Sequence, residues 1–316
     1  MNLKVCFLTE HWGSIVNESN APGFFGWYGL TLTHPASWEL ARVTGSRRAG
    51  YVAFDDGERV RLEVDWKPVG RKTTLAELAE RQRSALAKAA KRRNVAFESR
   101  PMGKVPGLRG WEYEAWAWGA DVSAREMLAR CSGCDRTALV RVLGPKENPP
   151  DDEAALVFGS LGCECGKDTE RWGAFGIDLR VPVRFELEKS SLKAGLCELA
   201  FSDKKIELRI LRASLGRRVL ETTKLVAWFG SVAGASLKPF DVEWLKDDLR
   251  GHLGYSCAAS ERANRRLLRI FRSKRAFAAR IFFCEPSDKI YAISADGTDD
   301  VADVVRQVAE GLACHG

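Results

Sequence analysis

The cysteines are the residues whose types and spacing suggest chemistry. Nine cysteines occur in the 316 residues. Cys131 and Cys134 are separated by two residues, and Cys163 and Cys165 by one. Paired cysteines of this kind are typical of zinc sites, in which four thiolates hold the ion tetrahedrally. If the fold brings the two pairs together, these four residues form a structural zinc site, the one cofactor that the sequence suggests.

A second group near the end of the sequence consists of Cys284, Cys314 and His315. It offers three zinc ligands, which would leave one coordination position open. We expect Cys131 to lie near Cys163, and Cys284 near Cys314, with Cα atoms within about 7 Å. Such pairs also fit disulfide bonds or packed reduced thiols, so the sequence leaves three alternatives open.

The remaining cysteines and histidines do not suggest a site. Cys6, Cys197 and Cys257 lie in apolar segments, where we expect buried thiols. His34 aligns with Val181 and His252 with Trp111 when the two halves of the sequence are compared, so we expect both histidines to be packing or surface residues. The sequence contains no P-loop, dinucleotide fingerprint, G-x-S-x-G or H-E-x-x-H motif. We therefore expect no ordinary enzyme.

One segment, 262–275, is strongly basic and contains no acidic residue. Its cations are Arg262, Arg265, Arg266, Arg269, Arg272, Lys274 and Arg275. As a helix, the segment would place Leu267, Leu268 and Phe271 on one face. It could then bind phosphates, an acidic protein surface or anionic lipid. The alternative is a solvated hairpin extension whose leucines pack on their own domain.

The strand expected at 111–118 carries three tryptophans. Trp111 lies on one face with Tyr113, whereas Trp116 and Trp118 lie on the other. Because tryptophan is a frequent interface anchor, Trp116 and Trp118 are candidate interface residues. The alternative is that a helix or another part of the chain covers them.

The sequence contains an internal repeat, which indicates one domain present in two copies. The segment 29–40 aligns with 176–187, and Leu-Arg-Gly recurs at 108–110 and 249–251. The cysteines follow the same order, since Cys131 aligns with Cys284 and Cys163 with Cys314. We therefore predict a tandem duplication.

The predicted domain boundaries follow from this alignment. The first repeat spans 29–163 and the second 173–316. Residues 1–28 form an N-terminal extension, and 164–172 link the repeats. Within the extension, 1–13 is too short for a signal-peptide core and is interpreted as a first strand.

Each repeat has the same predicted elements. Short alternating segments indicate strands, and helices are expected at 73–93 and 222–234. A terminal helix follows each of the acidic pairs 151–152 and 299–300, which are interpreted as helix N-caps. The predicted fold class is α+β, with an antiparallel sheet packed with helices in each repeat.

This order of elements resembles the superfamily of the photosystem PsbP subunits, their Ran-binding import-factor relatives and the bacterial DcrB-type proteins. The resemblance is carried by Pro35, Trp38, Thr74 to Leu78, Val105, Gly107 and Gly110. It implies an αβα sandwich in each repeat and a non-catalytic role in protein contacts. The second repeat departs from the pattern with Phe185 in place of the tryptophan.

Composition limits the class of protein. Apolar residues make up 45% and charged residues 29%, which is typical of a soluble globular chain, and the net charge is +7. No stretch is long and apolar enough to span a bilayer, and we expect a cytoplasmic protein. The oligomeric state stays open.

Three functions are carried forward. The first is a non-catalytic interaction or adaptor module whose partner is another protein. The second is a nucleic-acid-associated protein that uses 262–275. The third is a zinc-dependent or thiol redox protein built on the cysteines.

Overall fold

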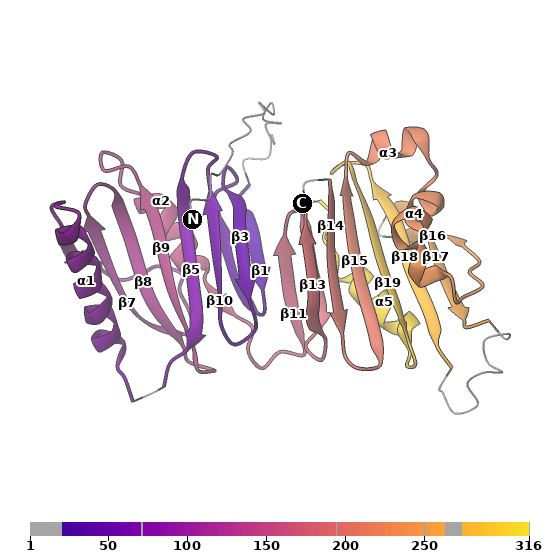
Figure 1. Cartoon of the computed structure of the whole chain (residues 1–316), viewed down its shortest axis with the longest axis horizontal. Coiled ribbons are helices and arrows are strands. Elements are labelled where there is room, and N and C mark those ends of the chain that lie inside the picture. Colours follow the sequence, from indigo (N-terminus) through magenta and orange to yellow (C-terminus); the bar gives the residue numbers. More distant parts are fainter. Residues whose placement is uncertain (1–20, 71, 194, 250, 263–273, 316) are drawn as a thin grey trace, which may run out of the picture.

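The computed structural model describes residues 21–70, 72–193, 195–249, 251–262 and 274–315. Within them, two seven-stranded antiparallel sheets flank a five-stranded sheet (Figure 1). Helices pack on the sheets, and the predicted α+β class is confirmed. The strand expected at 1–13 lies outside the described residues.

The first large sheet has the strand order β3-β4-β5-β9-β8-β7-β6. Its strands are β3 (Glu39–Gly45), β4 (Gly50–Asp55), β5 (Val60–Pro68), β6 (Glu98–Pro101), β7 (Trp111–Gly119), β8 (Ser123–Cys131) and β9 (Arg136–Gly144). Apolar alternation sets the buried face, since Leu62, Val64 and Trp66 of β5 are all fully buried.

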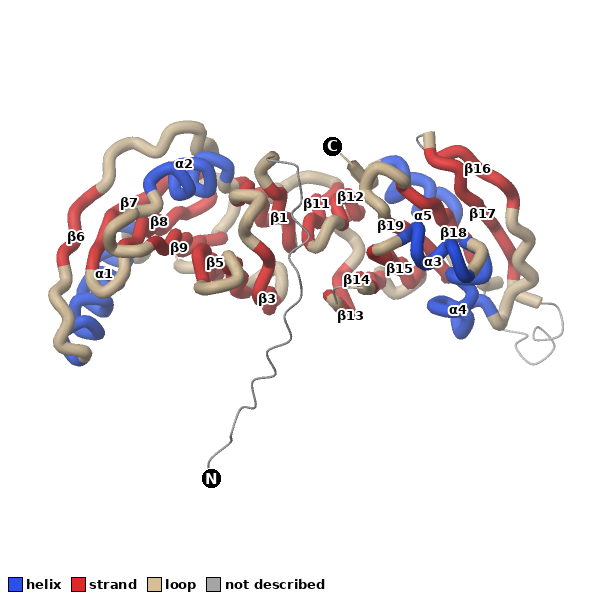
Figure 2. Tube along the Cα trace, turned by 90° about the horizontal axis from the view of Figure 1, so that it is seen from above, coloured by secondary structure: helices blue, strands red, loops and turns tan. Residues whose placement is uncertain are grey.

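Two helices cover opposite faces of this sheet. α1 (Leu75–Arg92) packs on β7 and β8. It begins with a threonine cap, because Thr74 and Glu77 form a reciprocal capping box. α2 (Asp151–Ser160) packs on β8 and β9 from the other side (Figure 2). The acidic pair expected to cap α2 lies inside its first turn instead, because the cap position is Pro150.

The second large sheet has the corresponding order β13-β14-β15-β19-β18-β17-β16. Its strands are β13 (Glu186–Leu192), β14 (Leu196–Ser202), β15 (Ile206–Ser214), β16 (Leu245–Leu249), β17 (His252–Ser260), β18 (Ala276–Cys284) and β19 (Lys289–Gly297). The two sheets thus connect their strands in the same sequence order.

Helices again lie on both faces of the second sheet. α3 (Gly216–Thr222) and α4 (Leu225–Leu237) pack on β19 and β18. α5 (Val301–Glu310) covers the other face, on the same side of the molecule as α2 (Figure 2). Here the predicted cap is confirmed, since the Asp300 side chain accepts a hydrogen bond from the Asp303 backbone N–H.

The five-stranded sheet joins the two halves in the order β10-β2-β1-β11-β12. Its strands are β1 (Gly23–Trp27), β2 (Leu30–His34), β10 (Gly162–Cys163), β11 (Thr169–Ala174) and β12 (Ile177–Pro182). β1 meets β11 where Gly26 lies opposite Gly173. A Cβ on Gly26 would lie 2.5 Å from the Arg171 carbonyl oxygen, so this approach requires glycine.

Two strands lie in segments that the sequence analysis assigned to neither repeat. β1 lies inside the expected extension 1–28, and β11 begins inside the expected linker 164–172. Both segments are ordered because each forms a hairpin with the strand that follows it. The sequence alignment began at the second strand of each hairpin and therefore left the first strand outside the repeat.

The tryptophans proposed as interface residues face α1. Trp116 is fully buried and packs with Leu75, Ala79 and Leu128. Trp118 is half-buried, and its indole N–H donates to Glu126 over 2.7 Å. The interface prediction is therefore wrong for Trp116, because α1 covers it.

Candidate metal centres

The four cysteines of the first half converge at one corner of the sheet. Cys131 ends β8, and Cys134 lies in the turn that leads to β9. After α2 the chain pairs with β2 through β10, which ends at Cys163, and Cys165 follows. All four Sγ atoms lie within 4.8 Å of one another. The expected proximity of Cys131 and Cys163 is confirmed at the level of their sulfur atoms.

The sulfur distances fit a metal site and not disulfide bonds. Sγ of Cys131 lies 3.6 Å from that of Cys165, and Sγ of Cys134 lies 3.7 Å from that of Cys163. A disulfide would need about 2.05 Å. Four sulfurs at about 2.3 Å from a tetrahedral zinc ion stand about 3.8 Å apart. The cluster therefore has the donor set and the spacing of a closed four-thiolate site.

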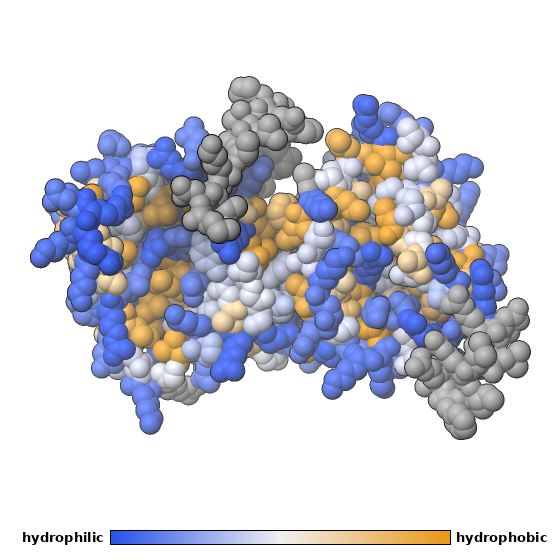
Figure 3. Space-filling model, viewed as in Figure 1, coloured by the Kyte–Doolittle hydropathy of each residue, from blue (hydrophilic) through white to orange (hydrophobic). Residues whose placement is uncertain are grey.

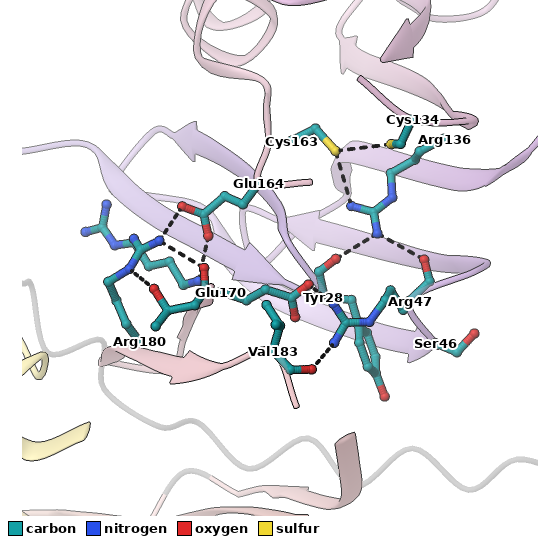
Figure 4. A network of polar contacts seen from close by, with 12 residues as sticks. Tyr28, Ser46, Arg47, Cys134, Arg136, Cys163, Glu164, Glu170, Arg180 and Val183 are labelled. Atoms are coloured by element: carbon teal, nitrogen blue, oxygen red, sulfur yellow. Dashed lines mark hydrogen bonds and ion pairs between the residues drawn. The ribbon is translucent and has the colours of Figure 1, made fainter. Parts of the chain in front are cut away.

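Arg136 places a positive charge beside this cluster. Its Nη1 lies 3.8 Å from Sγ of Cys163. Its Nη2 donates to the backbone oxygens of Tyr28 and Arg47, at 2.8 and 3.0 Å (Figure 4). These two hydrogen bonds fix the guanidinium group against the sulfur. The positive charge would offset part of the negative charge of a metal bound by four thiolates.

The thiols differ in how readily they ionise. Burial raises the pKa of Cys163 and Cys165. Burial also opposes ionisation of Cys131, but the Gly133 backbone N–H and the neighbouring thiols hold the pKa of Cys131 below its ordinary value. Cys131 thus ionises more easily than Cys163 or Cys165.

Ion pairs connect this corner to the second half of the chain. Glu164, which lies between two of the cysteines, binds Arg180 of β12 at 2.9 Å (Figure 4). Arg47 pairs with Glu170 of β11. Both contacts join the first half to the β11–β12 hairpin, so the cluster lies next to the seam between the halves.

A second cluster forms at the corresponding corner of the other sheet. Cys284 ends β18, and Cys314 and His315 follow α5. Nδ1 of His315 lies 3.2 Å from Sγ of both cysteines. His252, at the start of β17, contributes a fourth ligand atom, because its Nε2 lies 3.2 Å from Sγ of Cys314. The four ligand atoms all lie within 4.8 Å of one another.

His252 is a candidate ligand that the sequence did not indicate. We expected it to be a packing or surface residue because it aligned with Trp111. In the first sheet Trp111 lies directly opposite Cys131. Gly254 lies opposite Phe282, so the same register sets His252 opposite Cys284. The alignment of His252 with Trp111 could have indicated this ligand. A residue that takes the place of Trp111 lies opposite the cysteine of its own half, which was already suspected of binding metal.

The remaining cysteines and His34 have structural positions. Cys197 and Cys257 are buried as expected, and Cys6 lies outside the described residues. His34 is buried against the Phe54 ring, and burial lowers its pKa. These residues take no part in either cluster.

The basic segment is described only at its ends. Arg262 pairs with Asp241 at 2.6 Å, and Arg275 pairs with Asp296. Lys274 is exposed. The other four cations proposed for an anionic partner lie outside the described residues: Arg265, Arg266, Arg269 and Arg272. The two arginines at the ends thus bind carboxylates of their own domain.

Comparisons with known proteins give little guidance. No protein-family model matches the chain, and no curated protein does. Among solved structures, the chain is similar to the immunity protein TplEi of T6SS from Pseudomonas aeruginosa, in complex with an "L" peptide. The identity is 8%, the match covers 94% of this chain and 99% of that chain, and the TM-score is 0.34. Likeness at this level carries no inference about fold or function. Separately, none of the described helices is long and apolar enough to cross a membrane.

Proposed function

We propose that this chain is a non-catalytic interaction module in which two duplicated domains, joined edge to edge, present a composite surface to a protein partner. The observation that carries the proposal is the four-cysteine corner. Four thiolates occupy all four coordination positions of a tetrahedral zinc ion and leave none for a substrate or a reactive water. The ion would then stabilise the first domain instead of performing chemistry.

Duplication is supported by the way the halves are built. The two large sheets have corresponding strand orders, and each carries helices on both faces. Each half begins with a hairpin whose two-residue turn has positive φ values, at Tyr28–Gly29 and Phe175–Gly176. The resemblance to the PsbP and DcrB-type proteins stays a proposal of the same kind, and it points to the same adaptor role.

The surface carries exposed apolar side chains that a partner could contact. Hydrophobic residues reach the surface in separate patches between hydrophilic ones (Figure 3). Exposed large apolar side chains include Leu215, Leu245 and Leu253. Scattered apolar positions of this kind are common on soluble proteins, so they support a contact surface without identifying the partner.

The experiment is to replace the bound metal with cobalt(II) and to add small anions such as azide or cyanide. A site closed by four thiolates keeps its absorption spectrum, because no ligand can join without displacing a cysteine. A shifted spectrum would reveal an open position and favour the zinc-enzyme hypothesis. Turnover of a small metabolite, lost on changing one polar residue, would overturn the proposal outright.

The partner is tested separately, by affinity capture from the native host with the full chain as bait. Proteins and nucleic acids that remain bound are identified by mass spectrometry, and capture is repeated at rising salt. Protein partners are expected. Capture of nucleic acid alone, lost steeply with salt, would favour the phosphate-binding hypothesis instead.

A further inference from the structure

We infer that the second half of the chain binds its own zinc ion through His252, Cys284, Cys314 and His315. This inference does not depend on whether the first corner holds metal, because the two ligand sets share no residue. The ligands come from three places in the fold: the start of β17, the end of β18 and the chain after α5.

The geometry suits a tetrahedral ion. With sulfur at about 2.3 Å and nitrogen at about 2.0–2.1 Å from zinc, sulfur and nitrogen ligands stand roughly 3.5 Å apart. Three of the four sulfur–nitrogen distances in the cluster are 3.2 Å, and the fourth, between Cys284 and His252, is within 4.8 Å. A few tenths of an ångström of outward movement would therefore admit the ion.

The ligands are held in place by their surroundings. The His252 ring stacks on Phe282, with centroids 5.3 Å apart and planes inclined by 14°. The Ala313 backbone N–H donates to the Asp178 carbonyl oxygen over 2.7 Å, which fixes the chain just before Cys314. Contacts that orient a ligand in this way strengthen metal binding.

Charge also favours an ion at this corner. Two thiolates and two neutral imidazoles balance the charge of Zn²⁺ completely, so the loaded site would be neutral. Cys284 is fully buried, and a neutral site can occupy a buried corner at low cost. The four-cysteine corner would carry net negative charge when loaded, and there Arg136 lies beside the sulfur.

Packing alone explains the cluster less well than a metal does. In the first half the turn after β8 supplies Cys134, whereas the corresponding turn after β18 carries Ser287 in place of that cysteine. The missing ligand is replaced from a neighbouring strand, where His252 stands in the place of Trp111. Each corner thus has four donor atoms: four sulfurs at the first, and two sulfurs and two nitrogens at the second. Packing requires no fixed number of such donors, whereas a tetrahedral ion requires four.

The experiment counts zinc in the purified full chain and in four variants. We expect about two zinc ions per chain in the parent and about one in His252→Ala. Cys134→Ala should lose the other ion, and His252→Cys should keep both because cysteine is also a zinc ligand. The matched control is Cys257→Ala, a buried cysteine of the same strand outside the cluster, which should keep two.

Cobalt substitution identifies which site each variant retains. His252→Ala should leave the spectrum of a site with four sulfurs, and Cys134→Ala that of a site with mixed sulfur and nitrogen ligands. If His252→Ala retains as much zinc as the parent, the inference is wrong. A parent with one zinc that Cys134→Ala abolishes would also overturn it, while leaving the first corner intact. If His252→Ala fails to fold, the number of zinc ions bound by His252→Cys tests the inference instead. Loss of one zinc ion in His252→Cys would contradict it.

Discussion

At the scale of single residues, the two corners are built from ordinary side chains placed close together. The sequence identified all four cysteines of the first corner, because their short spacings are a local signal. It found only three of the four ligands of the second. His252 lies far from Cys284 along the chain, and only the register of β17 against β18 brings them together. Register depends on pairing over the whole hairpin, which spacing alone does not reveal.

Arg136 gives the first prediction. Arg136→Gln removes the positive charge next to Cys163 and should weaken zinc binding at the first corner by roughly 10–100-fold. Competition with a chelator of known affinity measures this effect. The control is Arg59→Gln, which removes an exposed arginine from the turn between β4 and β5 and should leave zinc affinity unchanged. Equal affinity in both variants would show that the guanidinium does not support the site.

At the scale of elements, local signals predicted the helices better than their ends. The capping box of α1 was visible as a threonine followed three residues later by a glutamate. The acidic pair before α2 looked like a cap but lies in the first turn, because Pro150 occupies the cap position. β1 and β11 lie in segments that we assigned to neither repeat, although each pairs with a strand that the alignment did include.

The capping box gives the second prediction. Thr74→Ala removes the hydrogen bond to the Glu77 backbone N–H and should lower the free energy of unfolding by about 1 kcal/mol. Urea unfolding followed by circular dichroism measures the difference. Thr73→Ala, one residue before the cap, is the matched control and should cost much less. Equal losses in the two variants would argue against a role of the cap.

An ion pair at α2, between the buried Arg125 and the exposed Asp151, gives the third prediction. Arg125 donates two hydrogen bonds to Asp151, at 2.7 and 2.9 Å, and they hold the pKa of Asp151 below its ordinary 3.8. A lowered carboxyl pKa stabilises the folded state above the ordinary value, and this contribution disappears as pH falls through the folded value. Because the Asp151 side chain is exposed to solvent, which screens the charge, Asp151→Asn should cost only about 0.2–1 kcal/mol at neutral pH.

The free energy of unfolding of the parent and of Asp151→Asn, measured across pH 2–7, tests whether the ion pair loses its contribution as pH falls. The difference in stability should shrink as pH falls below about 3.8, because the parent then loses the charged carboxylate. Asp152→Asn, at the neighbouring exposed position, is the control. A difference that stays constant with pH would mean that the ion pair contributes no linked stability.

At the scale of the whole molecule, the central sheet makes the two halves one body. Its strands contribute to a core that continues from the first half into the second, with Trp27 and Trp172 in edge-to-face contact at 5.0 Å. No single segment of the sequence predicts this sheet. It is assembled from strands on both sides of the seam, and pairing between strands far apart in the chain leaves no local pattern.

The seam gives the fourth prediction. Gly26→Val places side-chain atoms against the Arg171 backbone and should lower the free energy of unfolding by about 1–3 kcal/mol. The halves should then unfold in separate calorimetric transitions, because the contact that couples them is strained. Gly119→Val is the control, since no atom lies within 4 Å of the Cβ it would add. A single unchanged transition in Gly26→Val would show that the halves do not depend on this contact.

Each half of the chain brings four candidate ligands together at the same corner, and we propose that each set binds one zinc ion. Native mass spectrometry of the full chain, purified without chelator, tests it most directly. We expect a mass above that of the bare polypeptide by about two zinc ions, both lost on acid denaturation. A native mass equal to that of the bare polypeptide would contradict it, as would a mass lowered by the hydrogens lost in disulfide formation.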